Sequence, residues 1–434
     1  MGSSVALVVL DSLRADSFQQ SFDWLNGKRF SHAYSNSHWT IPSHVSLFTG
    51  KYASEVGVHG KSPMLDCPEA TIAEHLCQAG YSTSFYSANP MITYWNGWER
   101  GFDEVVEPAR LDPRDENLID WSQFAWEHPN SGVSRAIRAV LHSFRSDCPT
   151  VPAIKQGIRY WGRSRADGGI KKIRRRVKGS DYRHKDKFLV INLMETHAPY
   201  HAPDDAGSVD VKIGEAFTNS ISDPERIREG YAESVSYLSD EYQKLHAILV
   251  EDFDYVITVG DHGEMLGEHK MWNHGYGLYP ELVHVPFVIS GGGVENEVCE
   301  DIVSLLDIHK TISEMAGVDI NSRGQNLLKV PNERPLMTEF HGFLPWHREQ
   351  FERNGVAEGV YDEHNTPLRG IVLPEGYAYE THSEGFCTDD DLDMERAKTE
   401  LETIRSSVTE RKANPFSPEL DHETKRRLRN LGYA

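Results

Sequence analysis

Short apolar segments rich in β-branched residues alternate along the chain with longer segments whose apolar residues recur every three or four positions. The first pattern is typical of strands buried in a sheet, and the second is typical of helices. Five segments show the strand pattern: Val5–Leu10, Ser82–Ser87, Phe188–Met194, Tyr255–Val259 and Val285–Ile289. This alternation predicts an α/β fold with a mostly parallel central sheet.

Helical spacing marks three segments between or after these strands: Thr71–Gln78, Tyr231–Val250 and Ile302–Ala316. Gly80 and Gly317 follow the first and third segments, and a glycine in that position is typical of a helix C-terminus. We therefore expect helices that connect the strands and cover the sheet.

Beyond about residue 335, short segments bounded by turn residues replace this pattern. They predict three antiparallel strands, at Val356–Tyr361, Leu368–Leu373 and Gly376–Glu380. A charged helix is expected to follow at Asp390–Lys412. The sequence thus predicts a large α/β domain over residues 1–334 and a small α+β subdomain over residues 335–434.

Polar residues stand just after four of the predicted strands. They are Asp11, Asn89, Glu195-Thr196-His197 and Asp261-His262. Ligand sites in open α/β sheets lie beyond the carboxyl ends of the strands. We therefore expect these side chains to meet at one edge of the sheet.

Asp11, Asp261 and His262 supply two carboxylates and an imidazole, a partial ligand set for a divalent cation. A strand-end Asp can also be a helix N-cap, and His262 could hydrogen-bond within a turn. Glycines and ligand-type side chains are dense in Gly260–Glu264, directly after a strand, and this context favours a metal site.

The segment Trp39-Thr40-Ile41-Pro42-Ser43-His44 predicts a helix with Thr40 as N-cap and a proline in its first turn. The free N–H groups at such a helix start favour an anionic oxygen cluster. Thr40 would be well placed there as a metal-activated nucleophile.

Three segments, Val8–Asp16, Thr40–Gly50 and Gly260–Glu264, together resemble the sulfatase branch of the alkaline phosphatase superfamily. Further matches follow in the family order: Gly80–Thr83, Tyr279–Phe287, Ser304–Asp307, Ala316-Gly317 and Leu431-Gly432-Tyr433. The resemblance covers most of residues 4–330 and implies the fold of that family, with residues 1–334 as a catalytic domain.

The resemblance also implies roles for matching residues. Asp11, Asp261 and His262 match metal ligands, and Thr40 stands at the nucleophile position, which usually touches the metal as well. We therefore expect Asp11, Thr40, Asp261 and His262 to hold the cation.

Four further residues match positions near the anionic group of the substrate. His197 resembles the family histidine that binds this group or protonates the leaving oxygen, and His274 falls where many members carry a Lys or His. We count both as catalytic. Asn89 falls near a family Lys or Asn, and His44 replaces a family Arg; both are assigned to substrate binding.

Thr40 also departs from the family pattern. Sulfatases oxidise a Cys or Ser to formylglycine, but threonine carries a methyl group where the aldehyde needs a hydrogen. Ser12 likewise replaces the second acid that many members have after the first strand. Thr40 resembles the nucleophile of phosphodiesterase, phosphatase and phospho-alcohol transferase relatives, which form a phospho-threonine intermediate, and so favours phosphorus over sulfur.

The cofactor implied is one divalent cation, Mg²⁺, Mn²⁺ or Ca²⁺, although mixed oxygen and nitrogen ligands leave Zn²⁺ open. Relatives with two zinc ions need about three more ligands. Histidines that could serve are His197, His201, His269 and His274, but the chain lacks a matching Asp-x-x-x-His. A single cation is therefore favoured over two.

The chain has 45 Lys or Arg against 66 Asp or Glu, a net charge of −21. An acidic total argues against a dedicated nucleic-acid binder. Between Lys155 and Lys187, however, 13 Lys or Arg stand against three Asp, within an expected helical, basic insertion over residues 110–187. This stretch is either a solvated helix or a docking surface for an anionic partner. Its densest run contains Lys171, Lys172, Arg174, Arg175, Arg176 and Lys178.

Five scattered cysteines without C-x-x-C spacing favour a reducing compartment. The N-terminus lacks the pattern of a signal peptide, and no apolar stretch approaches the length of a membrane span. A cytoplasmic location is expected.

The function expected from these residues is metal-dependent hydrolysis of a phosphate or sulfate ester by Thr40, with a phosphate mono- or diester favoured. Two alternatives stay open. One is a transferase that moves a phosphoglycerol- or phosphoethanolamine-type group onto a glycan or lipid, and the other is a non-catalytic binding homologue.

Overall fold

The structure is a computed structural model that describes residues 2–93, 97–106, 138–143, 154, 168–180, 186–200, 211, 213–218, 221, 223–344, 347–388 and 391–413. Its centre is an eight-stranded sheet with the order β10-β2-β9-β6-β1-β5-β3-β4. The strands are β1 (Val5–Leu10), β2 (Lys28–Tyr34), β3 (Ser82–Ser87), β4 (Glu104–Val106), β5 (Lys187–Leu193), β6 (Tyr255–Gly260), β9 (Phe287–Gly291) and β10 (Glu297–Ser304). Only β9 runs antiparallel to its neighbours in this sheet of described strands, which confirms the α/β class and the mostly parallel sheet.

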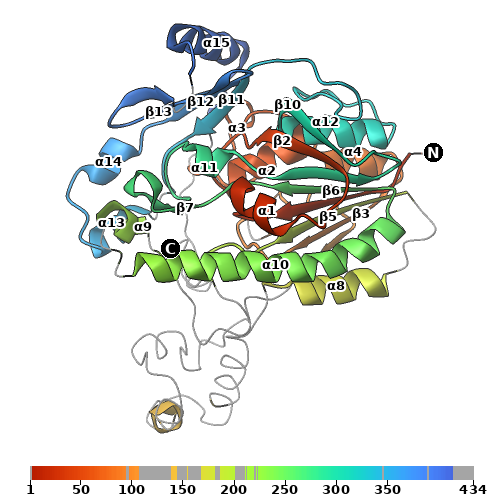
Figure 1. Ribbon diagram of the computed structural model, residues 1–434, viewed down its shortest axis with the longest axis horizontal. Coiled ribbons are helices and arrows are strands. Elements are labelled where there is room, and N and C mark those ends of the chain that lie inside the picture. Colours follow the sequence, from red (N-terminus) through yellow and green to blue (C-terminus); the bar gives the residue numbers. More distant parts are fainter. Residues whose placement is uncertain are drawn as a thin grey trace.

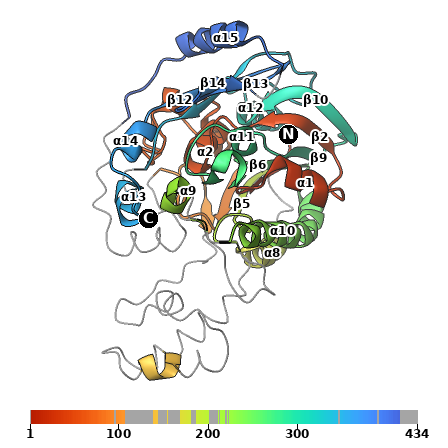
Figure 2. The same cartoon turned by 60° about the vertical axis from the view of Figure 1, so that its left-hand side comes forward.

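Helices cover both faces of the large sheet (Figures 1 and 2). One face carries α2 (Thr40–Thr49), α3 (Ala53–Val56), α4 (Ile72–Gln78) and α12 (Leu305–Met315). The other carries α1 (Ala15–Ser21), α8 (Ile170–Gly179) and the long α10 (Pro224–Asp252). A sheet buried on both faces needs apolar residues at every position, and all six residues of β1 are buried.

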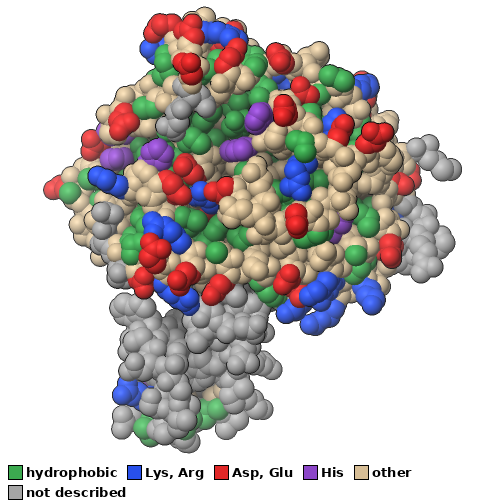
Figure 3. Space-filling model, viewed as in Figure 1, with side chains coloured by type: hydrophobic (Ala, Val, Ile, Leu, Met, Phe, Trp, Pro, Cys, Tyr) green, Lys and Arg blue, Asp and Glu red, His purple; other side chains and the backbone are tan. Residues whose placement is uncertain are grey.

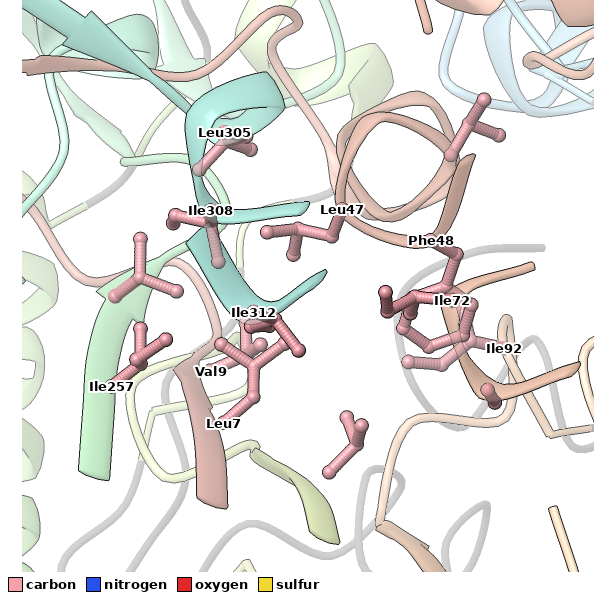
Figure 4. Packing of buried hydrophobic residues seen from close by; sticks show 14 of the residues in the cluster. Leu7, Val9, Leu47, Phe48, Ile72, Ile92, Ile257, Leu305, Ile308 and Ile312 are labelled. Carbon is pink, nitrogen blue, oxygen red and sulfur yellow. The ribbon is translucent and has the colours of Figure 1, made fainter. Parts of the chain in front are cut away.

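Two apolar cores result from this sandwich. Leu7 and Val9 of β1 point to the α2 and α12 side, where Leu47, Ile308 and Ile312 pack against them (Figure 4). The intervening residues of β1 face the core under α10 and α8. Because α2 packs beside α12 in this core, the start of α2 is fixed relative to the strand ends.

A second, antiparallel sheet follows in the chain, with the order β11-β12-β13-β14. Its strands are β11 (Leu336–Phe340), β12 (Leu368–Leu373), β13 (Gly376–Thr381) and β14 (Gly385–Thr388), and α15 (Met394–Ser407) packs on it through Ala397 and Leu401. β11 lies against the segment before α2, because Asn36 Nδ2 donates to the Met337 carbonyl. The boundary at residue 334 stays a prediction.

Smaller elements complete the described chain. They are α9 (Ile213–Thr218), β7 (Met265–Leu266), a 3₁₀ turn at Glu268–Lys270, β8 (Trp272–Asn273), α11 (Pro280–Val283), α13 (His347–Arg353) and α14 (Val360–His364). No helix in these described ranges has the length and apolar character needed to cross a bilayer.

Two predicted elements are wrong. Val356–Tyr361 is not a strand: Gly355 and Gly359 both have positive φ, and α14 begins at Val360. Ile302–Ala316 is not helical throughout, because Ile302–Ser304 ends β10 and pairs with β2. There, β-branched residues favour the strand, and the helix begins only after Ser304, whose backbone N–H donates to the Asp307 carboxylate.

Of the expected insertion over residues 110–187, the structure describes residues 138–143, 154, 168–180 and 186–187. The basic run within it forms α8, a helix that packs alongside α10. The remainder of the insertion lies outside the described residues.

Candidate metal and nucleophile site

The carboxyl ends of the central strands bring the expected polar residues together. β1 lies between β5 and β6, and Leu10 is in register with both Leu193 and Gly260. The residues that follow these partners, Asp11 and Asp261 among them, therefore meet at the same edge of the sheet. This edge is the candidate functional site.

Asp11, Asp261 and His262 each offer a ligand atom, and these atoms all lie within 4.8 Å of one another. The Nε2 atom of His262 is 3.7 Å from Asp11 Oδ1 and 3.6 Å from Asp261 Oδ2. The other ring nitrogen, Nδ1, is 2.8 Å from the carbonyl oxygen of Gly263, to which it can donate. Nε2 is then the lone-pair nitrogen turned toward the carboxylates, as a metal ligand must be.

The charges of this cluster fit a divalent cation. Burial, and then the Asp11 carboxylate, raise the pKa of Asp261 well above its usual range. Asp261 Oδ1 accepts hydrogen bonds from the backbone N–H groups of Ser12 and His262, but Oδ2 has no hydrogen-bond partner among the described residues. A buried carboxylate oxygen without a donor, beside a second carboxylate, is the environment that a cation would satisfy.

Asp11 is held by two amide side chains. Asn89 Nδ2 donates to Asp11 Oδ2 at 2.8 Å, and Asn192 Nδ2 donates to the same oxygen at 3.1 Å. Burial alone would raise the pKa of Asp11, but His197, His262 and the Asn89 amide together lower it. With Oδ2 bound to these amides, Asp11 Oδ1 is the oxygen turned toward His262.

Thr40 is the first residue of α2, and not its N-cap as expected; the N-cap is Trp39. The Trp39 carbonyl accepts the first helical hydrogen bond from the Ser43 N–H, so the Thr40 hydroxyl has no capping role. Thr40 Oγ1 instead lies 3.4 Å from His262 Nε2 and accepts a hydrogen bond from Asn89 Nδ2 at 3.2 Å. The hydroxyl therefore faces the cluster of Asp11, Asp261 and His262, at the first turn of α2.

His197 and His274 flank the same cluster. The ring centroids of His197 and His274 are 4.9 Å apart, and His274 is 4.5 Å from His262. His274 Nδ1 is 3.1 Å from both carboxylate oxygens of the buried Glu264. Burial lowers the pKa of His274, but the Glu264 carboxylate outweighs burial, and the pKa is raised.

His44 lies one helical turn after Thr40, on the inner side of α2. Its Nδ1 atom is 2.9 Å from the Thr40 carbonyl oxygen and 3.7 Å from Asp261 Oδ2. Burial lowers the pKa of His44 to about 4, so the ring is neutral and donates from Nδ1 to the carbonyl. His44 thus contacts the site from the protein interior, and its role in substrate binding stays a prediction.

Direct contacts therefore join five expected residues, Asp11, Thr40, Asn89, Asp261 and His262, whereas His197 and His274 lie beside them. Among candidates for a second metal, His269 stacks on Tyr279, and His201 lies outside the described residues. The residues described here contain a single group of three or more metal-ligating side chains.

Two residues of the site were missed from the sequence. Asn192 stands inside the apolar strand β5, and a single amide side chain in a fully buried strand could have indicated a residue of the site. Glu264 directly follows the Asp261-His262-Gly263 segment, but its pairing with His274 depends on how the chain between them folds back.

Known proteins resemble this chain in sequence. A family model described as Sulfatase matches residues 5–318. The uncharacterized sulfatase YidJ of Escherichia coli is 20% identical over 389 residues, which cover 79% of this chain and 74% of that protein. The choline-sulfatase of Rhizobium meliloti is 20% identical over 331 residues, 67% of this chain and 61% of that protein.

Solved structures share the fold at low sequence identity. A phosphonate monoester hydrolase from Silicibacter pomeroyi has a TM-score of 0.63 and 16% identity, with 94% of this chain and 96% of that chain covered. BT1596, a 2-O GAG sulfatase, has a TM-score of 0.60 and 13% identity, with 94% and 91% covered. Because the family model spans well over half of the sequence, the chain belongs to the sulfatase family of the alkaline phosphatase superfamily and is an ester hydrolase.

Proposed function

We propose that this protein hydrolyses a phosphate mono- or diester, in preference to a sulfate ester, with Thr40 as the nucleophile. The observation that supports this most directly is the position of Thr40 Oγ1, 3.4 Å from His262 Nε2 and hydrogen-bonded to Asn89. The hydroxyl lies at the start of a helix of ten residues, beside three metal-ligating side chains. A nucleophile, a cation site and free backbone N–H groups are thereby brought to one point.

Asp11, Asp261, His262 and Thr40 would hold one divalent cation: Mg²⁺, Mn²⁺ or Ca²⁺ by their oxygen ligands, or Zn²⁺ by the mixed set. When bound, the cation would lower the pKa of the Thr40 hydroxyl and offset negative charge on the ester. The first-turn N–H groups of α2 bind the non-bridging oxygens, and Asn89 orients Thr40 Oγ1.

In the first half of the reaction, Thr40 Oγ1 attacks phosphorus in line and the bond to the leaving oxygen breaks. His274 is the better proton donor to that oxygen, because its raised pKa favours the protonated ring. His197, next to it, would bind the anionic group. Water then attacks the phosphorus of the phospho-threonine and the bond to Thr40 Oγ1 breaks. The product is phosphate from a monoester, or a phosphate monoester from a diester.

The preference for phosphorus rests on Thr40 itself. Threonine cannot become formylglycine, since its Cβ carries a methyl group, so the hydrate that releases sulfate in sulfatases has no counterpart here. The shared fold does not decide between the two esters, because both phosphonate monoester hydrolases and sulfatases have it.

The test is a parallel assay of 4-nitrophenyl phosphate, bis(4-nitrophenyl) phosphate and 4-nitrophenyl sulfate with Mg²⁺, Mn²⁺, Ca²⁺ and Zn²⁺. We expect turnover of a phosphate ester, and preference for the sulfate would overturn the proposal. Thr40→Ala should lose at least about a thousandfold in kcat/KM. Thr49→Ala, a buried threonine at the far end of α2, is the matched control and should keep its activity.

Acid quenching during turnover adds an independent test of the nucleophile. Mass spectrometry should find a phosphoryl group on the peptide that contains Thr40, and not in Thr40→Ala. Full activity of Thr40→Ala, or a phosphoryl group on another residue, would contradict the assignment.

A further inference from the structure

Helix α8 is amphipathic in an unusual sense, because its polar side consists of cations alone. Ile170, Ile173 and Val177 are buried in the core under the sheet. The six Lys and Arg residues occupy the rest of the helix surface, and no acidic residue interrupts them. Lys and Arg side chains gather where α8 lies, at the lower right of the molecular surface (Figure 3).

Three of the six cations are engaged with the protein itself. Arg174 forms an ion pair with Glu241 at 2.5 Å, and Arg176 pairs with Glu104. The ammonium group of Lys171 lies 5.1 Å from the ring centre of Tyr237. These contacts attach α8 to α10 and β4. They involve three of the six cations of α8.

The other three cations, Lys172, Arg175 and Lys178, are exposed. Across the described part of the chain, they form no hydrogen bond or ion pair. Their spacing of three residues places them along one side of the helix, at steps of about 4.5 Å. We call these three residues the basic stripe.

The basic stripe starts near the catalytic edge of the sheet. The backbone N–H of Ile170 donates to Glu195 Oε1 at 3.0 Å, and Glu195 stands two residues before His197. From there α8 runs beside α10, with Lys171 opposite Tyr237 and Arg174 opposite Glu241. A chain bound along α8 would therefore have one end beside the segment that leads to His197.

A bilayer is a poor partner for this surface. The apolar side of α8 is buried in the protein core and cannot insert into lipid. Three cations at an anionic membrane would contribute about 3 kcal/mol in all. A flat anionic surface would also meet the acidic remainder of a chain with net charge −21.

A narrow polyanion contacts the stripe without meeting that acidic surface. Nucleic acid is less suitable, because single strands are held by aromatic side chains that stack on the bases, and α8 contains no aromatic residue. A glycan chain with sulfate or phosphate esters needs only charge at regular intervals.

We infer that the basic stripe binds an anionic glycan chain, of which one ester is the group presented to the catalytic edge. This inference rests on the proposed function for the ester at the site, but the binding surface can be tested without turnover. It identifies the substrate class as a chain that carries several anionic esters.

The experiment compares the wild type with Lys172→Gln/Arg175→Gln/Lys178→Gln. The matched control is Arg396→Gln/Lys398→Gln/Arg405→Gln on α15, where these exposed cations pair with acidic residues. The control variant has the same net charge as the stripe variant. Gln is a good helix former, so both helices should persist in circular dichroism. The probe is a defined heparin oligosaccharide, titrated by calorimetry at low and high salt.

We expect salt-sensitive binding by the wild type and the control, and at least about a tenfold weaker affinity for the stripe variant. Equal binding by all three proteins, or none, would overturn the inference. Vesicles of phosphatidylcholine with phosphatidylserine, and a single-stranded DNA oligonucleotide, are titrated in parallel. Tighter stripe-dependent binding of either would assign the surface to that partner instead. Because binding is measured without turnover, failure of the Thr40 mechanism would leave this outcome unchanged.

Discussion

Replacing Asn89 and Asn192 separately would distinguish the two tasks that amide side chains perform at the site. Asn89 Nδ2 contacts both Asp11 Oδ2, at 2.8 Å, and Thr40 Oγ1, at 3.2 Å. Among the described residues, Asn192 Nδ2 donates only to Asp11 Oδ2, at 3.1 Å. Asn89→Ala therefore removes support from the proposed metal ligand Asp11 and from the proposed nucleophile Thr40, whereas Asn192→Ala removes support from Asp11 alone.

The magnitudes follow from the charge of each acceptor. A hydrogen bond to a buried carboxylate such as Asp11 contributes about 1.5–3 kcal/mol, and loss of such a partner typically weakens metal binding by about 10–100-fold. The bond to the neutral Thr40 hydroxyl contributes about 1 kcal/mol, which corresponds to about a fivefold change in rate. Both variants should bind metal more weakly, and only Asn89→Ala should also turn over more slowly once metal is saturating.

Two measurements separate these effects. Calorimetric titration with Mn²⁺ gives the metal affinity of each variant, and kcat at saturating Mn²⁺ gives the effect on the proposed nucleophile, Thr40. Thermal melting of both variants checks that the fold persists, since Asn89 Oδ1 also accepts the Met91 N–H. Unchanged Mn²⁺ affinity would refute the orienting role of the amides. An equal fall in kcat for both variants would refute the specific contact of Asn89 with Thr40.

Three further predictions concern titration and packing. Burial lowers the pKa of His309 to about 3, and neither ring nitrogen has a hydrogen-bond partner in the described structure. His309 therefore stays neutral in the folded state at a pH where the unfolded state binds a proton, which is below about pH 6.5. From pH 7 to pH 5, the free energy of unfolding of the wild type should fall by about 2 kcal/mol more than that of His309→Leu, as measured by urea unfolding. Equal decreases in the two proteins would contradict this account. Glu264→Gln should shift the alkaline limb of kcat/KM to lower pH, because Glu264 raises the pKa of His274, and an unmoved limb would show that His274 does not control it. Ile308→Ala, in the core between α12 and the sheet, should cost about 2–5 kcal/mol in urea unfolding, against less than about 0.5 kcal/mol for the exposed Val330→Ala.

Much of the sheet is predictable from local pattern. Val5–Leu10 and Ser82–Ser87 form strands with the predicted bounds. For Val5–Leu10 the reason is that a strand buried on both faces appears in the sequence as an unbroken apolar run. The same locality explains the cluster of Asp11, Asp261 and His262: Asp11 and Asp261 each follow a strand, and parallel strands place their ends together.

The errors arise where local pattern has two solutions. Ile302 and Val303 fit a helix face and a strand equally well, and pairing with β2 decides for the strand. At Thr40, the sequence indicates the start of the helix but not which residue caps it. As the N-cap, Thr40 would use its hydroxyl to cap the helix, but as the first helical residue it turns the hydroxyl toward His262.

The remaining parts of the site depend on contacts between distant parts of the chain. Asn192 and Asp11 are 181 residues apart, and no periodicity within either strand shows that the two side chains meet. Glu264 and His274 are joined across ten residues that include the short β7–β8 pair. Such pairs follow from register between elements, which composition and spacing do not contain.

The complete burial of α2 bears on how the proposed nucleophile, Thr40, moves. All ten residues of this helix are buried, and its last turn closes at Gly50, whose left-handed φ of 65° suits a C-terminal cap. A helix of this kind cannot fray at one end without exposing apolar surface to water, so its amide hydrogens should exchange with solvent only when the whole domain opens. The Thr40 hydroxyl is then positioned by the global stability of the fold, and any conformational step in turnover has to come from the segments around α2.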